Sequence, residues 1–502
     1  MKRGLWLARV NVVGAVRSLG RPWMAVLLLS GIAWGEVSIC AAQEGQQELG
    51  STFTLDRFGK FNAPESGARS EQESGVDEDG NPYLKVVLRP ESHPSLKYRF
   101  QRNEAELKPG AAQVHFGRAL LMWQMLPEDV RSDVSMSWGG DREPTLQERK
   151  EMVESLASVY AEIRAMALCE DQKSDLRLRD IGGLEMFEVL LPEYQSAREL
   201  ARALGHKYRV QLAEGDVDGA VDTLRDGFQL SAFVGQGETL VQVLVGIAIH
   251  NIMLEEALLL SELSEAPSLY WPIATLPRPF VTGHRAIELE LGTIHRSLPV
   301  LKEAKMEMRD ELYWSKAWAK LTEDLIKVGM YSGETSTKVG VALLSVATAE
   351  DSKARLIASG MDEDEVKAMP LMRAVLLEAS QEIQRINDDL NKGFLLKGKA
   401  GLEVSRVQMG AFDDWANGER KNSAGALIAG LMVPAVEAVH QAILRQEFFV
   451  NRAMTMEAIC LHVQANGGEL PDSLESLPPA PALKNPFTDE HFEMSSKASE
   501  DG

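Results

Sequence analysis

Apolar residues recur at spacings of three and four along most of this 502-residue chain, and this pattern restricts the fold more than any other feature. Residues at that spacing line one face of a helix, whereas a half-buried strand places every second residue on one face. The clearest stripe consists of Met372, Val375, Ala379, Ile383, Ile386 and Leu390. Such a face must pack against a neighbour. We therefore predict an all-α protein, an irregular multi-helix array of antiparallel helical hairpins with a small extended or β appendage at the C-terminus.

Proline, glycine and charge clusters divide the chain. Residues 43–82 are rich in Gly, Ser, Glu, Asp and Gln and have few apolar residues to bury, which is typical of a linker. The predicted divisions are a signal peptide at 1–42, a flexible acidic linker at 43–82, a helical region at 83–265, a proline-rich loop at 266–283, a second helical region at 284–466, and an extended tail at 467–502.

The first 42 residues have the layout of an export signal. A basic region precedes a short apolar run from Met24 to Ala33, and Cys40-Ala41-Ala42 places small residues before a cleavage point. The apolar run is shorter than the roughly 20 residues of a membrane helix. We predict a periplasmic or extracellular protein; the alternative is a retained N-terminal anchor, which would be the chain's only contact with a membrane.

The net charge limits the classes of partner. The formal charge is −21, and removing residues 1–42 would take away five basic residues and Glu36, so it would become −25. A surface this acidic repels phosphate backbones. We expect no nucleic-acid partner and consider a protein or peptide partner instead.

Several helices can be placed individually. Pro109 is suited to the first position of a helix that ends near Met125, and Thr145 with Glu148 forms a capping-box pattern. Longer helices are expected at 239–260 and 435–464. Polar residues inside the first of these favour a buried helix over a membrane span. In the tail, Leu470–Leu474 should form one helical turn, and Phe487–Met494 a short strand or hairpin.

A helical hairpin is predicted at 197–231, with its turn at Gly215-Asp216. Gly215-Asp216-Val217-Asp218-Gly219-Ala220, followed by Leu224 and Gly227, resembles the turn and second helix of a tetratricopeptide repeat. Tyr208 stands where that repeat normally has a small residue. The sequence shows no second copy at the repeat period, whereas a peptide-binding solenoid needs about three.

Two further resemblances concern the export and the tail. Four segments are similar to an uncharacterised family of exported, helix-rich bacterial proteins: Leu191–Gln195, Leu244–Ile249, Leu269–Trp271 and Asn485–Thr488. This resemblance implies an all-helical exported protein and no activity. Gly468–Leu474 and Pro486-Phe487 after a long helix resemble the C-terminal part of pseudopilin-like proteins. The N-terminal pilin helix is missing from its usual place.

The sequence contains no Gly-x-Ser-x-Gly elbow, no glycine-rich phosphate loop with its lysine, and no His-Glu-x-x-His pair. We predict no catalytic residues and no cofactor. The best candidate metal ligands are His284, Glu288 and His295, which fall on one helix face. The alternative, which we favour, is a half-buried polar stripe with a His–Glu hydrogen bond.

Other reactive or paired side chains have simpler interpretations. Glu255-Glu256 and Asp388-Asp389 point in different directions on a helix, and we expect solvated faces. Trp314 and Trp318 are expected to pack in the core or in a subunit contact; the alternative is a platform for a sugar. After export only Cys169 and Cys460 would remain; we place both inside helices as buried thiols, although an exported protein could pair them.

Three functional hypotheses remain open. The first is an exported helical structural or protein-interaction component of the bacterial envelope. The second is a metal-dependent enzyme with a site assembled between helices, and the third is a secretion- or pilus-associated component. The sequence favours a protein that is not an enzyme, but it does not decide between the three hypotheses.

Overall fold

The structure is a computed structural model. It describes residues 75–76, 82–83, 91–92, 94–136, 143–180, 192–260, 267–327, 350–418, 423–432 and 436–492. The predicted signal peptide, most of the predicted linker and the last ten residues therefore lie outside the described residues. Within the described part the protein is all-α with small strand elements, which confirms the predicted fold class.

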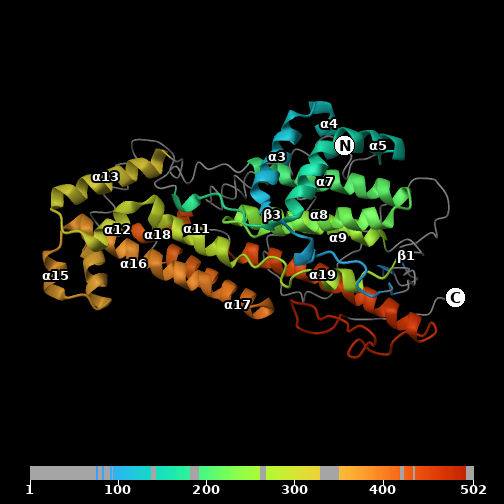
Figure 1. Cartoon of the computed structure of the whole chain (residues 1–502). Coiled ribbons are helices and arrows are strands. Elements are labelled where there is room, and N and C mark those ends of the chain that lie inside the picture. The colour runs from blue at the N-terminus through green and yellow to red at the C-terminus, as the bar shows by residue number, and fades with distance from the viewer. Residues whose placement is uncertain are drawn as a thin grey trace, which may run out of the picture.

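The helices gather into two lobes joined by one long helix (Figure 1). The first lobe comprises α3 (Ala112–Met125), α4 (Glu128–Met136), α5 (Leu146–Ser155), α6 (Ala157–Ala167), α7 (Pro192–Ala213), α8 (Val217–Gly235) and α9 (Leu240–Leu260). The second comprises α11 (His284–Ser297), α12 (Pro299–Met306), α13 (Glu311–Lys327), α15 (Glu363–Ala368), α16 (Leu371–Asn391), α17 (Gly398–Asn417) and α18 (Ala424–Met432). The short α10 (Tyr270–Ala274) lies between the lobes in sequence, and α19 (Val436–Ala465) contacts both lobes.

Strands and short 3-10 turns are minor parts of the structure. The 3-10 turns are η1 (Glu104–Glu106), η2 (Leu178–Asp180) and η4 (Lys392–Leu395). Strand β1 (Gly75–Val76) pairs antiparallel with β2 (Pro82–Tyr83), and β3 (Lys108–Ala111) pairs parallel with β4 (Cys169–Asp171). Because β3 takes in Pro109, α3 begins at Ala112, three residues later than predicted.

Helices α7, α8 and α9 form the centre of the first lobe. The predicted hairpin is present: α7 and α8 pack side by side, and the Asp216 side chain accepts a hydrogen bond from Gly219 N, which caps α8. The resemblance to a tetratricopeptide repeat implies that Gly227 lets the two helices of the hairpin approach closely. In the structure a Cβ on Gly227 would instead lie 2.0 Å from Met253 Sδ on α9. Helix α9 is long and apolar enough to span a membrane, but most of its apolar window is buried against its neighbours, as expected for a core helix.

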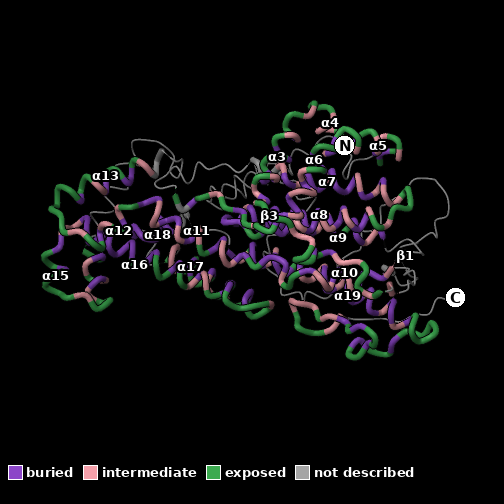
Figure 2. The backbone as a smooth tube through the Cα atoms, in the orientation of Figure 1, coloured by how far each residue is buried: buried purple, intermediate pink, exposed green. Residues whose placement is uncertain are grey.

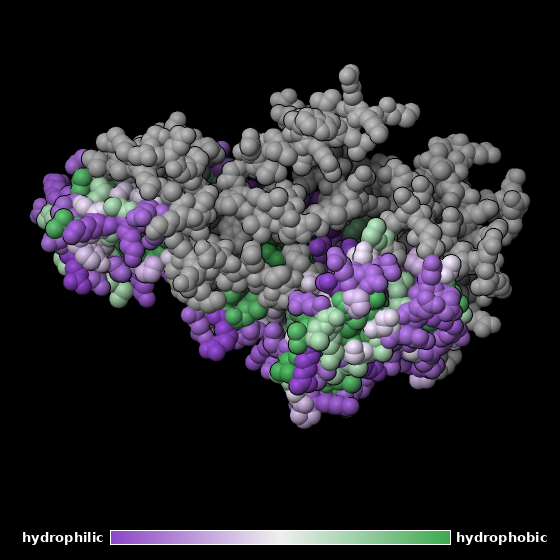
Figure 3. Space-filling view, turned by 90° about the horizontal axis from the view of Figure 1, so that it is seen from above, coloured by the Kyte–Doolittle hydropathy of each residue, from purple (hydrophilic) through white to green (hydrophobic). Residues whose placement is uncertain are grey.

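The core extends through both lobes, with buried residues on the inward sides of the helices (Figure 2). Trp314 and Trp318 are buried, as predicted. Seen from above, the coloured surface is mainly hydrophilic with smaller hydrophobic areas (Figure 3). Val114, Leu121 and Met125 on the outer face of α3 are among the exposed apolar side chains.

Two local predictions need correction. The spacing of Met152, Leu156, Val159, Ile163 and Met166 predicts one continuous helix. These residues belong instead to two helices, α5 and α6, which meet at Leu156. We expect the proline-rich loop at 266–283 to cross the surface, but it contains the short helix α10, and Leu269, Tyr270 and Ile273 are buried. The Thr145 capping box is confirmed, with Glu148 N donating to the Thr145 hydroxyl.

Candidate functional site on helix α19

The C-terminal segment returns along α19 in the antiparallel direction (Figure 1, red). We call residues 470–492 the tail. His462 Nδ1 lies 3.2 Å from Pro478 O, Thr455 Oγ1 bonds both the amide and the carbonyl of Leu483, and Asn451 Nδ2 donates to Lys484 O at 2.8 Å. As the tail numbers rise, the α19 numbers fall. Side chains of α19 therefore hold the tail. Within the described residues of the tail, one isolated bridge is the only strand-like pairing.

Helix α10 supplies the other side of this contact. Tyr270 OH donates to Pro481 O at 2.8 Å, and the Tyr270 and Trp271 rings are 5.0 Å apart. Buried Glu457 on α19 accepts hydrogen bonds from Ser268 Oγ and Leu269 N, which fixes α10 against α19. We call Tyr270, Asn451, Thr455 and His462 the tail-binding face.

Burial along the tail repeats every three residues. Pro471, Leu474, Leu477 and Ala480 are buried, and the pairs of residues between them are exposed. Three residues per turn is the period of an extended, proline-rich chain rather than of an α-helix or strand. The predicted helical turn at 470–474 is wrong, because this segment has no helical residues. Pro471 and the prolines at 478, 479 and 481 favour the extended form.

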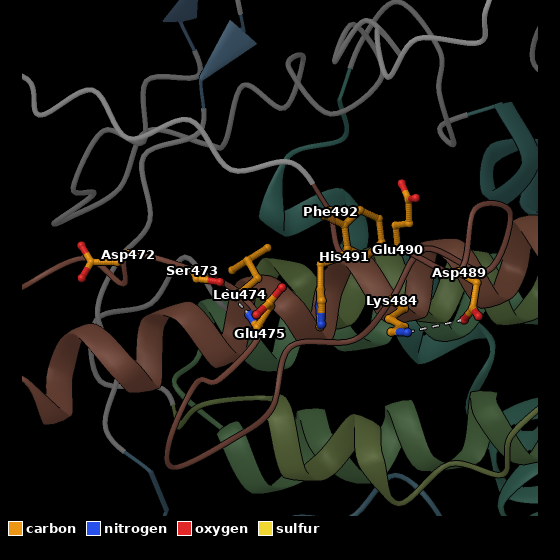
Figure 4. Close-up of a pocket in the computed structure, with 9 residues that line it drawn as sticks. All are labelled: Asp472, Ser473, Leu474, Glu475, Lys484, Asp489, Glu490, His491 and Phe492. Atoms are coloured by element: carbon orange, nitrogen blue, oxygen red, sulfur yellow. Dashed lines mark hydrogen bonds and ion pairs between the residues drawn. The ribbon is translucent and has the colours of Figure 1, made fainter.

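A surface cavity of about 400 Å³ lies where the two halves of the tail meet (Figure 4). It is lined by Asp472, Ser473, Leu474, Glu475, Lys484, Asp489, Glu490, His491 and Phe492. In Figure 4 a dashed line joins Lys484 to Asp489, whose Oδ1 lies 4.0 Å from Lys484 Nζ. Lys484 and His491 also form an isolated antiparallel bridge. The strand or hairpin predicted at Phe487–Met494 extends past the described residues, and within Phe487–Phe492 this bridge is the only strand-like pairing.

The lining gives the cavity a negative charge. Four carboxylates surround it, and the single lysine of the lining is already paired with one of them. Leu474 and Phe492 add apolar wall, and Phe492 is fixed by a ring contact with Phe448 of α19 at 5.5 Å. A site with carboxylates around an apolar wall is suited to a cationic side chain with an aliphatic stem, such as that of lysine or arginine.

The three candidate metal ligands do lie on one helix, α11, but they do not converge. His284 is half-buried at the first position of α11, and Glu288 is exposed. His295 Nε2 lies 3.2 Å from Ser380 Oγ on α16, and burial lowers the His295 pKa. Among the residues that the structure describes, no group of three or more His, Cys, Asp or Glu side chains could hold a metal ion.

Buried ion pairs in the first lobe were not expected from the sequence. Asp226 on α8 accepts hydrogen bonds from the buried Arg102 and from Arg164, whose Nη1 is 3.3 Å away. Glu256 is also buried, 2.7 Å from Arg209 Nη2, so the predicted solvated face is wrong for Glu256. Burial raises the pKa of both carboxyls, and the arginines oppose this rise. These pairs join α6, α7, α8 and α9 and have a structural role.

A half-buried carboxyl joins the two lobes. Glu290 on α11 accepts a 2.6 Å hydrogen bond from Leu240 N in the first turn of α9. Burial raises the pKa of Glu290 to about 7, although this hydrogen bond favours the ionised form. Arg285, one and a half turns earlier on α11, pairs at 2.9 Å with buried Glu238 just before α9.

Cys169 and Cys460 are buried and are not joined in a disulfide. Cys460 lies in α19 as predicted, but Cys169 begins strand β4 instead of continuing a helix. Burial raises the pKa of the Cys169 thiol, which disfavours the reactive thiolate.

No family model matches this chain, and neither a curated protein nor a solved structure matches it. The resemblances to an exported family, to tetratricopeptide repeats and to pseudopilin-like proteins therefore stay predictions.

Sequence reasoning missed the tail as a site, although its signal is visible. Pro471, Leu474, Leu477 and Ala480 repeat at intervals of three, which matches neither the period of a helix nor that of a strand. The partners on α10 and α19 carried no comparable signal, because Tyr270 and Pro481 are 211 residues apart.

Proposed function

We propose that this chain is an exported protein-interaction component of the bacterial envelope that binds a positively charged segment of a partner protein. The observation that carries the proposal is the carboxylate-lined cavity of the tail. The cavity is held by a segment that is itself fixed to α19, so its carboxylates are placed before a partner arrives. Such placement reduces the ordering cost of binding.

The overall charge supports a basic partner. A formal charge of −21 attracts positively charged surfaces over distances of about a Debye length, roughly 8–10 Å at physiological salt. The exposed Glu475 and Glu490 side chains would then contact the partner directly. Export is supported by the basic region and apolar run of residues 1–42.

The test is affinity capture from a detergent extract of bacterial envelopes. The purified chain is compared with a variant carrying Glu475→Gln and Glu490→Gln, and with a control carrying Glu363→Gln and Glu403→Gln. The control pair consists of exposed glutamates on α15 and α17, which remove the same charge away from the cavity. All four positions are solvent-exposed, so each variant should fold normally.

We expect a partner to be retained by the unaltered chain and by the control, and to be lost from the cavity variant. Retention should fall as salt is raised, because exposed charge pairs are screened. Repeated capture of no partner, or equal retention by the cavity variant, would contradict the proposal.

A further inference from the structure

The contacts between the tail and the tail-binding face are directed at the peptide backbone. Tyr270 OH, Thr455 Oγ1 and Asn451 Nδ2 donate to carbonyl oxygens of Pro481, Leu483 and Lys484, respectively. Backbone carbonyls are present in any extended chain, so these bonds select conformation rather than particular side chains. Donation from fixed side chains to the carbonyls of an extended proline-rich segment is a recurring mode of peptide recognition.

The apolar part of the contact determines which side chains a bound segment must carry. Leu474, Leu477 and Ala480 present one face of the tail at a three-residue interval. The exposed fractions of Leu477 and Ala480 are 3% and 0%. Pro478, Pro479 and Pro481 limit the other conformations of the free segment, which reduces the entropy lost on binding.

The link between α19 and the tail is exposed to solvent. Residues 464–470 are all exposed. Gly467 and Gly468 have φ values of 68° and 101°, and no atom lies within 4 Å of the place where a Cβ would sit. This link is not packed into the core, so the tail is held on α19 by its own contacts and not by the link.

We propose that the tail-binding face is a binding site for an extended, proline-rich segment of a partner, with an apolar residue at every third position, and that the tail is its resident intramolecular occupant. The tail has the advantage of covalent attachment, equivalent to a local concentration in the millimolar range. A partner segment therefore binds well only when the tail is released. This proposal does not depend on the carboxylate-lined cavity or on its partner.

The test uses the full chain with Leu477→Asp and Ala480→Asp, which place charges against the tail-binding face and leave the cavity lining unchanged. Ser476→Asp, at an exposed position of the same tail, is the matched control. The probe is a fluorescent peptide with the sequence of residues 469–492, and its anisotropy reports binding. A second peptide with the same two aspartate substitutions measures non-specific binding.

We call the chain with Leu477→Asp and Ala480→Asp the released variant. We expect it to bind the probe at least ten-fold more tightly than the unaltered chain or Ser476→Asp does, and not to bind the second peptide. Adding Tyr270→Phe to the released variant should weaken binding several-fold. Adding Tyr313→Phe should not, since that hydroxyl bonds to Glu303 in the second lobe.

A released variant with an unchanged circular dichroism spectrum and melting temperature that does not bind the probe would overturn the proposal. Equal binding by the unaltered chain and the released variant would also overturn it. If the aspartate variant does not fold, Leu477→Ala with Ala480→Gly takes its place, with the same expected order of affinities. Loss of probe binding and loss of the captured envelope partner are separate results, so either proposal can fail alone.

Discussion

Asp226 shows at the level of a single residue how the first lobe holds charge in its interior. It lies 2% exposed on α8, where it meets buried Arg102 from the segment before η1 and Arg164 from α6. Removing one partner from such a cluster leaves the other charges buried without compensation. No single-sequence signal marked this residue, because its partners are 124 and 62 positions away.

Asp226→Asn should therefore lower the free energy of unfolding by roughly 3–5 kcal/mol, measured by urea denaturation at pH 7. Asp218→Asn is the matched control on the same helix, because Asp218 is exposed and pairs with exposed Lys97. It should leave the denaturation midpoint nearly unchanged. A comparable loss in both variants would contradict the structural role given to Asp226.

The raised pKa of Glu290 predicts that the stability of the protein depends on pH. The pKa of Glu290 is about 7 in the folded protein, against 4.5 for an ordinary glutamate, so between these values the folded state holds a proton that the unfolded state releases. Stability contributed by this group is therefore lost as pH rises from 4.5 through 7. Glu290→Gln should reduce the loss of stability between pH 5 and pH 8 by about 1–3 kcal/mol. If the stability of the variant depends on pH in the same way as that of the unaltered protein, the raised pKa of Glu290 is contradicted.

Elements were predictable where their signal was local. The spacing of apolar residues located α16 and α19, and Gly215-Asp216 located the α7–α8 turn, because each signal lies within the element itself. The division between α5 and α6 at Leu156 was missed because the apolar stripe continues across it. The tail was predicted as an extended segment, but its buried face was missed because a period of three matches neither a helix nor a strand.

Close packing of α8 on α9 gives a test at this scale. A Cβ on Gly246 would lie 2.3 Å from Gly235 Cα, so the two backbones would have to separate. Gly246→Ala should destabilise the protein by about 1–3 kcal/mol in thermal or urea unfolding. Gly117→Ala on the exposed face of α3 meets nothing within 4 Å and should stabilise it by roughly 0.5–1 kcal/mol. The same sign of change in both variants would contradict this packing.

At the scale of the whole molecule, the arrangement of the helices depends on contacts that could not be predicted from the sequence. Helix α19 bonds to α17 near its start, where Ser405 Oγ is 3.0 Å from His440 Nδ1, and to the start of α10 through Glu457. These pairs are separated by 35 and 188 residues, and one sequence contains no record of which distant helices meet. For the same reason the face of α10 and α19 beneath the tail could not be recognised, even though both the tail and α19 were recognised separately.

Cleavage of the exposed link tests most directly whether the tail is a ligand of the tail-binding face. A protease recognition sequence inserted between Gly467 and Gly468 would allow the tail to be severed from the folded full chain, followed by size-exclusion chromatography. We predict that the severed tail elutes with the body of the protein, and that excess peptide of residues 469–492 displaces it. Immediate separation of the tail from a body with unchanged helix content would contradict the assignment.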